Sequence, residues 1–127
     1  MRLILDTHAF LWYVGRGKEL SSRARTLIEG PDEKVVSQAS VWEMSIKSSL
    51  GKLSLSEPFE VFLPEQLRTN GFAILEIDLA HTLRAHSLPY HHRDPFDRLL
   101  VSQCLVEGLP IITRDVIFDK YGVERLW

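Results

Sequence analysis

The sequence is poor in cysteine, in long apolar runs and in charge of one sign. Cys104 is the only cysteine among 127 residues, which excludes an internal disulfide and fits a reducing, cytoplasmic setting best. No apolar run reaches the roughly 20 residues that a membrane-spanning helix needs. The apolar start MRLILDTHAFLW contains Asp6 and lacks a small-residue cleavage site. We therefore expect neither a signal peptide nor a membrane anchor.

The charge balance argues against a strongly basic surface. The net charge is −2 and the sequence pI is about 6.2, so nucleic-acid binding would need a local basic rim. No group of cysteines and histidines has the spacing of a zinc site. With 45% hydrophobic and 25% charged residues, the chain is expected to form a single globular domain over residues 1–127.

Short apolar runs alternate with segments of helical periodicity along the chain. Strands are expected at 2–5, 34–37, 72–77 and 110–113, with a short edge strand within 121–127. Helices are expected at 7–15, 21–30, 38–51, 57–71, 78–88 and 94–108. Pro64 is expected to split or kink the fourth helix. This alternation predicts an α/β fold with a mostly parallel sheet that helices cover on both faces.

Two acidic residues follow predicted strands. Asp6 comes directly after the strand RLIL, and Asp115 follows the strand PIIT with one residue between. In parallel α/β sheets, ligand sites form at the carboxyl ends of the strands. We therefore expect both carboxylates at a functional edge of the sheet.

Two more acids lie on the apolar faces of predicted helices. Asp97 shares a helix face with Leu100, Val101, Cys104 and Leu105. Glu43 likewise shares a face with Ala39, Ile46 and Leu50. A carboxylate that points toward a core is costly unless it is paired or bound to a metal.

Together these four acids predict a metal site. Close carboxylates repel one another, so without a cation some of them would have to hold protons. Mg²⁺ or Mn²⁺ would relieve this repulsion, because hard cations take oxygen ligands and keep several waters. Such a metal activates water toward a phosphodiester and stabilises charge on the phosphoryl oxygens.

The stretch HHRDPFDRLL, at 91–100, admits two interpretations of its first aspartate. Asp94 before Pro95 is a common helix start, and Asp97 can also interact with that cap. The apolar stripe favours an inward role for Asp97. Asp94 acts either as a helix cap alone or as a cap that also supports the metal site. Hydroxyls next to the acids are candidates for supporting hydrogen bonds, although local turn bonds are their commoner role: Thr7, Ser40 and Thr113.

Four segments in register resemble PIN-domain proteins, and most closely the VapC-type toxins of bacterial toxin–antitoxin pairs. They are LILDTHAFLW, VSQASVWEMSIKSSLGKL, HHRDPFDRLLVSQCLVEG and IITRDVIFDKYGVERLW. The likeness covers almost the whole chain and is loose only from Lys52 to Asn70. It implies a PIN fold, which is a small α/β/α sandwich around a parallel sheet.

The resemblance also implies an activity, a metal, a site and partners. The activity is that of a Mg²⁺- or Mn²⁺-dependent endoribonuclease of a type II toxin–antitoxin system. A VapB-like antitoxin is the implied inhibitor, and homodimers are common in the family. The family's four acids fall on Asp6, Glu43, Asp97 and Asp115, with Asp94 auxiliary. We expect Asp6, Asp97 and Asp115 to hold the metal, and Glu43 to ligate it or to orient the attacking water.

Basic residues near the acids are candidates for contacts with RNA phosphates. Arg93, Arg98 and Arg114 flank the predicted acids in sequence. Lys47, one turn after Glu43, is either such a contact or a surface ion pair with Glu43.

Aromatic and histidine side chains gave weaker expectations. Trp12, Tyr13 and Trp42 would stack on bases or receive antitoxin side chains, although packing is the commoner role for at least one tryptophan. His91 and His92 are expected in a solvated loop. His8, His81 and His86 show no pattern that predicts a role.

Two other functions remain open from the sequence. A phosphatase of the haloacid dehalogenase kind also has an aspartate after its first strand, but its motif needs a second aspartate where this chain has His8. A non-catalytic binding module with the same fold is the other alternative, against which four intact acids argue.

Overall fold

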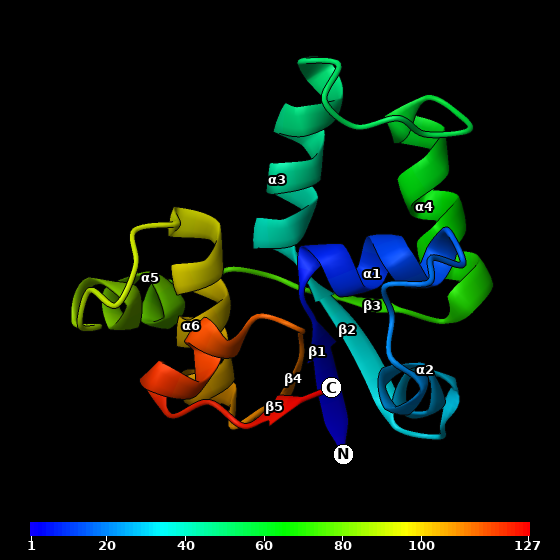
Figure 1. Cartoon of the computed structure of the whole chain (residues 1–127). Coiled ribbons are helices and arrows are strands. Elements are labelled where there is room, and N and C mark those ends of the chain that lie inside the picture. The colour runs from blue at the N-terminus through cyan, green and yellow to red at the C-terminus, as the bar shows by residue number, and fades with distance from the viewer.

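The computed structural model describes residues 1–127 and contains one five-stranded, all-parallel sheet in the order β3-β2-β1-β4-β5 (Figure 1). The strands are β1 (Arg2–Leu5), β2 (Glu33–Ser37), β3 (Ala73–Leu75), β4 (Ile111–Ile112) and β5 (Arg125–Leu126). The predicted α/β class is confirmed, and the tail forms the expected edge strand.

Six α-helices and one short 3₁₀ helix connect the strands. They are α1 (Thr7–Val14), α2 (Ser22–Glu29), α3 (Gln38–Ser49), α4 (Phe59–Asn70), α5 (Leu79–His86), α6 (Pro95–Glu107) and η1 (Val116–Tyr121). The sequence pattern did not predict η1. No helix is both long and apolar enough to cross a membrane.

The helices bury both faces of the sheet, as the apolar strand sequences predict. Leu3 and Leu5 of β1 belong to one core cluster, which includes Phe10 of α1 and Met44 of α3. Ile4, between them, faces a second cluster, which α6 and η1 supply: Val101, Cys104 and Phe118. The three layers match the expected sandwich.

The strand register sets the carboxyl ends of β1, β2 and β4 level with one another at one edge of the sheet. Leu5 pairs with Val36 on one side and with Ile112 on the other. The residues that follow these partners are Asp6, Ser37 and Thr113. α1 and α3 begin at this edge, directly after β1 and β2 (Figure 1). The fold therefore delivers a set of polar side chains to the carboxyl ends of its central strands.

Pro64 does not split its helix. α4 runs from Phe59 to Asn70 with Pro64 inside it. Proline removes one backbone hydrogen bond from a helix interior, but the adjacent Phe62 and Leu63 are buried. We attribute the intact helix to this packing, which outweighs the local preference.

The third strand is shorter than the apolar run FAILEI. It spans Ala73–Leu75 and does not include Phe72, whose backbone N–H donates to the carbonyl of Leu67 at the end of α4. Gly71 makes this turn with a left-handed backbone, φ 68°.

Candidate active site

Asp6 lies buried at the junction of β1 and α1. Its Oδ1 accepts a hydrogen bond from the backbone N–H of Ala9 over 2.7 Å, which caps α1. Its Oδ2 accepts one from the Thr113 hydroxyl over 2.5 Å. Burial raises the pKa of Asp6, the bonds from Thr113 and Ala9 oppose this, and the negative charge of Asp115 adds to the rise. The two hydrogen bonds thus hold the carboxylate in a single orientation, while its burial destabilises the charged form.

Asp115 reaches the same corner from β4. Thr113 follows β4, and its Oγ1 accepts a hydrogen bond from the backbone N–H of Asp115 over 3.0 Å. The Asp115 side chain caps η1 by accepting from the N–H of Ile117 over 3.0 Å. Asp115 itself is exposed. Its turn is therefore fixed while its carboxylate remains accessible to a ligand.

Glu43 approaches from α3 as a buried carboxylate with two side-chain partners. Its Oε1 accepts from the hydroxyl of Thr7 over 2.7 Å, and its Oε2 accepts from Nζ of Lys47 over 2.8 Å. Lys47 thus forms the ion pair that its spacing allows, one turn along the helix. Both oxygens of Glu43 point where α1 and α3 meet.

Asp97 lies in the first turn of α6, with a quarter of its side chain exposed. Burial and the nearby negative charges together raise the pKa of Asp97 to about 7; burial contributes most, followed by Asp94, Asp6, Glu43 and Asp115. A charge acts this strongly only at short range. The four predicted acids therefore share one electrostatic environment, although they come from four separate elements.

The oxygen donors in this acid cluster (Asp6, Glu43, Asp97 and Asp115) fit a hard divalent cation. A carboxyl pKa near 7 means that the cluster tends to hold a proton where a cation would otherwise balance the charge. All four side chains offer oxygen, and none offers sulfur, which suits Mg²⁺ or Mn²⁺.

The auxiliary residues fall into distinct positions. Asp94 caps α6, since its Oδ1 accepts from the backbone N–H groups of Phe96 and Asp97. The negative charge of Asp94 also raises the pKa of Asp97, so Asp94 contributes to the electrostatic environment of the cluster. Ser40, fully buried one turn before Glu43, has no hydrogen-bond partner for its Oγ. The supporting hydrogen bond expected of Ser40 is therefore absent.

Arg98 is not an RNA contact, and the prediction for it was wrong. It is buried, and its guanidinium donates to the carbonyls of Ala85, Leu88 and Pro89. Of the other predicted phosphate contacts, Arg93 and Arg114 are exposed, and Lys47 is paired with Glu43.

Two histidines lie closer to the cluster than the sequence indicated. His92 is half-buried instead of solvated: its Nδ1 lies 2.8 Å from the Tyr121 hydroxyl, and its Nε2 lies 3.5 Å from Oδ2 of Asp97. His8 lines a cavity beside Asp6. Neither position follows from periodicity, because His92 lies in a loop and His8 is an exposed residue in the first turn of α1.

A third histidine belongs to a separate polar group, Asp78, His81 and Glu107, at the packing of α5 on α6. The backbone N–H of Asp78 donates to Nδ1 of His81, and Nε2 of His81 lies 2.9 Å from Glu107. Both ring nitrogens are therefore engaged by the protein. We assign this group to helix capping and packing; it contains none of the four predicted acids.

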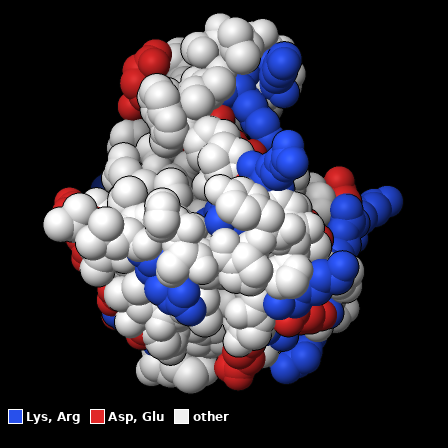
Figure 2. All heavy atoms as spheres, turned by 90° about the vertical axis from the view of Figure 1, so that its left-hand side faces the viewer, with Lys and Arg blue, Asp and Glu red and all other residues white.

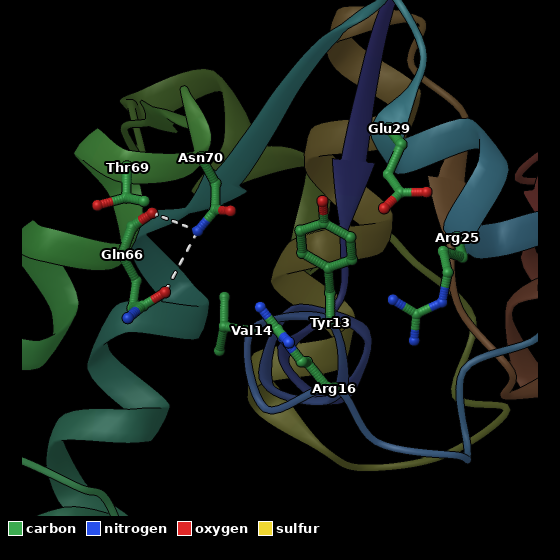
Figure 3. A pocket seen from close by; sticks show the side chains of 8 residues that line it. All are labelled: Tyr13, Val14, Arg16, Arg25, Glu29, Gln66, Thr69 and Asn70. Atoms are coloured by element: carbon green, nitrogen blue, oxygen red, sulfur yellow. Dashed lines mark hydrogen bonds between the residues drawn. The ribbon is translucent and has the colours of Figure 1, made fainter.

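The largest cavity is also remote from the acids. It has a volume of about 610 Å³ and lies among α1, α2 and α4 (Figure 3). Its lining is largely polar: Tyr13, Val14, Arg16, Arg25, Glu29, Gln66, Thr69 and Asn70. A smaller cavity of about 360 Å³ includes Asp6 and Asp115 in its lining. The larger cavity therefore contains none of the four predicted acids in its lining, whereas the smaller one contains two of them.

Known proteins resemble this chain in both sequence and structure. The PIN domain family model matches residues 3–124. Ribonuclease VapC22 of Mycobacterium tuberculosis is 28% identical over 116 residues, which are 89% of this chain and 86% of the relative. Ribonuclease VapC16 of the same organism is 42% identical over 48 residues, which are 38% of this chain and only 34% of that relative.

Solved structures share the fold at low sequence identity. A chain in the crystal structure of VapBC2 from Rickettsia felis bound to a promoter DNA fragment matches with a TM-score of 0.73 and 14% identity, over 100% of both chains. A chain of DNA-bound VapBC from Salmonella typhimurium matches with a TM-score of 0.71 and 14% identity, over 98% and 96% of the two chains. On the sequence match over nearly its full length, the chain belongs to the PIN domain family.

Proposed function

We propose that this chain is a Mg²⁺-dependent endoribonuclease, with Mn²⁺ as a substitute metal, and that residues 1–127 act as a single PIN domain. The observation that carries the proposal is the convergence of Asp6, Glu43, Asp97 and Asp115 into one electrostatic environment. Relatives that are named ribonucleases support it.

Each acid has a role that follows from its fixed contacts. Asp6, Asp97 and Asp115 hold the cation directly or through water. When bound, the cation makes a water more acidic and offsets charge on the phosphate that is attacked. Glu43, whose oxygens Thr7 and Lys47 orient, ligates the cation or positions the water for in-line attack. The Thr113 hydroxyl donates to the Asp6 carboxylate and accepts from the backbone N–H of Asp115, and so fixes the position of one relative to the other.

A VapB-like antitoxin is the proposed inhibitor, and the cytoplasm the proposed location. Support comes from solved complexes of the same fold, VapBC2 from Rickettsia felis and VapBC from Salmonella typhimurium.

The face over α5 and α3 is mostly uncharged in Figure 2, and Leu79 and Leu83 of α5 are 73% and 61% exposed. We propose this face for a homodimer contact; sedimentation of Leu83→Glu, beside the parent chain, tests it.

Cleavage of a mixed cellular RNA pool tests the activity. Purified protein, free of antitoxin, is incubated with Mg²⁺, with Mn²⁺ or with EDTA. Asp97→Asn is the inactive variant, and Asp32→Asn is the matched control, because Asp32 contacts only the chain's amino terminus among charged groups.

We expect defined fragments from the parent protein and from Asp32→Asn, but none with EDTA or from Asp97→Asn. Equal cleavage by Asp97→Asn would contradict the proposed site. Absence of both cleavage and Mn²⁺ binding in the parent protein would favour a non-catalytic binding module instead.

A further inference from the structure

The cavity beside the acid cluster has a second wall that the cluster does not explain. Besides Asp6 and Asp115, it is lined by His8, Trp12, Arg114 and Val116. Its volume of about 360 Å³ lies at the lower end of small-ligand pockets, about 300–1,000 Å³. A ligand of one nucleotide fits that space, whereas a duplex does not.

Trp12 is the centre of this wall and is held on several sides. The His8 ring stacks on it, with centroids 5.5 Å apart and planes 20° apart. The Arg114 guanidinium carbon lies 4.5 Å from its ring centroid. Trp127 meets it edge-on, with centroids 6.1 Å apart. Because these contacts already order the Trp12 ring, a ligand that stacks against this wall loses little affinity to the ordering of side chains.

Arg114 keeps its charge available. It is exposed and forms no ion pair, although Asp115 is its neighbour in the chain. Its guanidinium lies over the indole instead. A guanidinium in this state donates readily to two oxygens of one phosphate. It also offsets the repulsion that the acid cluster exerts on a polyanion.

We propose that His8, Trp12 and Arg114 form a nucleotide subsite next to the acid cluster, where Arg114 holds a phosphate and the stacked rings hold the adjacent base of single-stranded RNA. The inference rests on the proposed ribonuclease function for its substrate class. A base must leave its helix to stack on a side chain, so the subsite selects unpaired segments.

Binding without cleavage tests the subsite. All substitutions are made in an Asp97→Asn background, since Asp97 does not line the cavity. The probe is a short single-stranded RNA of mixed sequence with a terminal fluorophore, alone or annealed to its complement, and the readout is anisotropy. His8→Ala and Arg114→Ala are compared with Arg23→Ala, an exposed arginine of α2 outside the cavity.

We expect His8→Ala and Arg114→Ala each to weaken single-strand binding about tenfold, with Arg23→Ala unchanged and duplex binding equal in all variants. Stacking also has a spectroscopic signature, namely quenching of tryptophan emission by the RNA. This quenching should fall in Trp12→Phe, which keeps an aromatic ring in place, and persist in Trp42→Phe. Circular dichroism of every variant verifies folding.

The outcomes separate this inference from the proposed activity. If the unsubstituted protein cleaves no RNA but the binding losses appear, the subsite stands and the ribonuclease proposal fails. If that protein cleaves RNA while His8→Ala and Arg114→Ala bind RNA as tightly as the Asp97→Asn background, the subsite alone is wrong. No RNA binding by the Asp97→Asn background, or equal losses of duplex binding, would also overturn the subsite.

Discussion

Thr113, the first residue after β4, donates its hydroxyl to Oδ2 of Asp6, the first residue after β1, over 2.5 Å. The same hydroxyl oxygen accepts from the backbone N–H of Asp115. The first bond depends on the parallel pairing of Leu5 with Ile112, which sets the two strand ends level, and the second is a local bond within the turn after β4. One buried threonine thereby orients two proposed metal ligands.

Thr113→Val should lower RNA cleavage and Mn²⁺ affinity about 10- to 100-fold, the usual effect of removing a group that orients a metal ligand. Valine keeps the volume but loses the hydroxyl. Thr113→Ser, which keeps it, should retain most of the activity. Calorimetric Mn²⁺ titration and the RNA cleavage assay give the two measurements. Equal metal affinity in the valine variant would show that Asp6 holds its orientation without Thr113.

The metal-free protein should lose stability as pH rises from about 4 to about 7. The folded-state pKa of Asp97 is about 7, above the ordinary aspartate value of 3.8, so the folded state binds more protons in this window. Stability then falls with rising pH, by at most about 4 kcal/mol for this group.

Urea unfolding in EDTA at several pH values measures this slope. Asp97→Asn should flatten it, because the amide does not titrate. Mg²⁺ should raise the stability at pH 7 in the parent protein more than in the variant. A slope of the opposite sign in the parent protein would contradict the assignment.

The fold could be predicted from the sequence because its local signals agree. Asp94 caps α6 where its position before Pro95 predicts a helix start, and Gly108, at the end of the expected helix 94–108, has a φ of 67°. The inward direction of Asp97 likewise followed from helical periodicity.

Other features depend on contacts between distant segments and leave no local pattern. His92 meets Tyr121 across 29 positions of the chain, and His81 meets Glu107 across 26. Arg98 looked like a surface residue because it follows Asp97 at a helix start. Its partners are carbonyls at the end of α5 and in the following loop, which only the packing of α5 on α6 brings near.

Arg98 should therefore matter for stability and not for RNA contact. Arg98→Met keeps much of the apolar stem but removes the guanidinium that donates to the carbonyls of Ala85, Leu88 and Pro89. We expect a loss of about 3 kcal/mol in unfolding free energy, since the carbonyls of Leu88 and Pro89 lose the charged donor, whereas that of Ala85 keeps the backbone N–H of Leu88. Arg93→Met, at an exposed loop position, should cost less than about 0.5 kcal/mol. Denaturant unfolding of both variants compares them, and equal stability would contradict a structural role for Arg98.

Lys47 should oppose metal binding while it orients Glu43. Its Nζ lies 2.8 Å from Oε2 of Glu43, so it occupies an oxygen that the cation would otherwise use and adds positive charge nearby. Lys47→Met should therefore tighten Mn²⁺ binding about two- to fivefold, the scale of a partly exposed ion pair. Cleavage should fall in the same variant if the lysine also contacts the RNA phosphate, and should rise at low metal concentration if it does not.

Calorimetry with Mn²⁺ and cleavage over a range of Mg²⁺ concentrations distinguish these two roles. Arg68→Met, at an exposed position on α4, serves as the control for removal of one positive charge. Weaker Mn²⁺ binding by Lys47→Met alone would mean that the ion pair serves mainly to hold Glu43 in place.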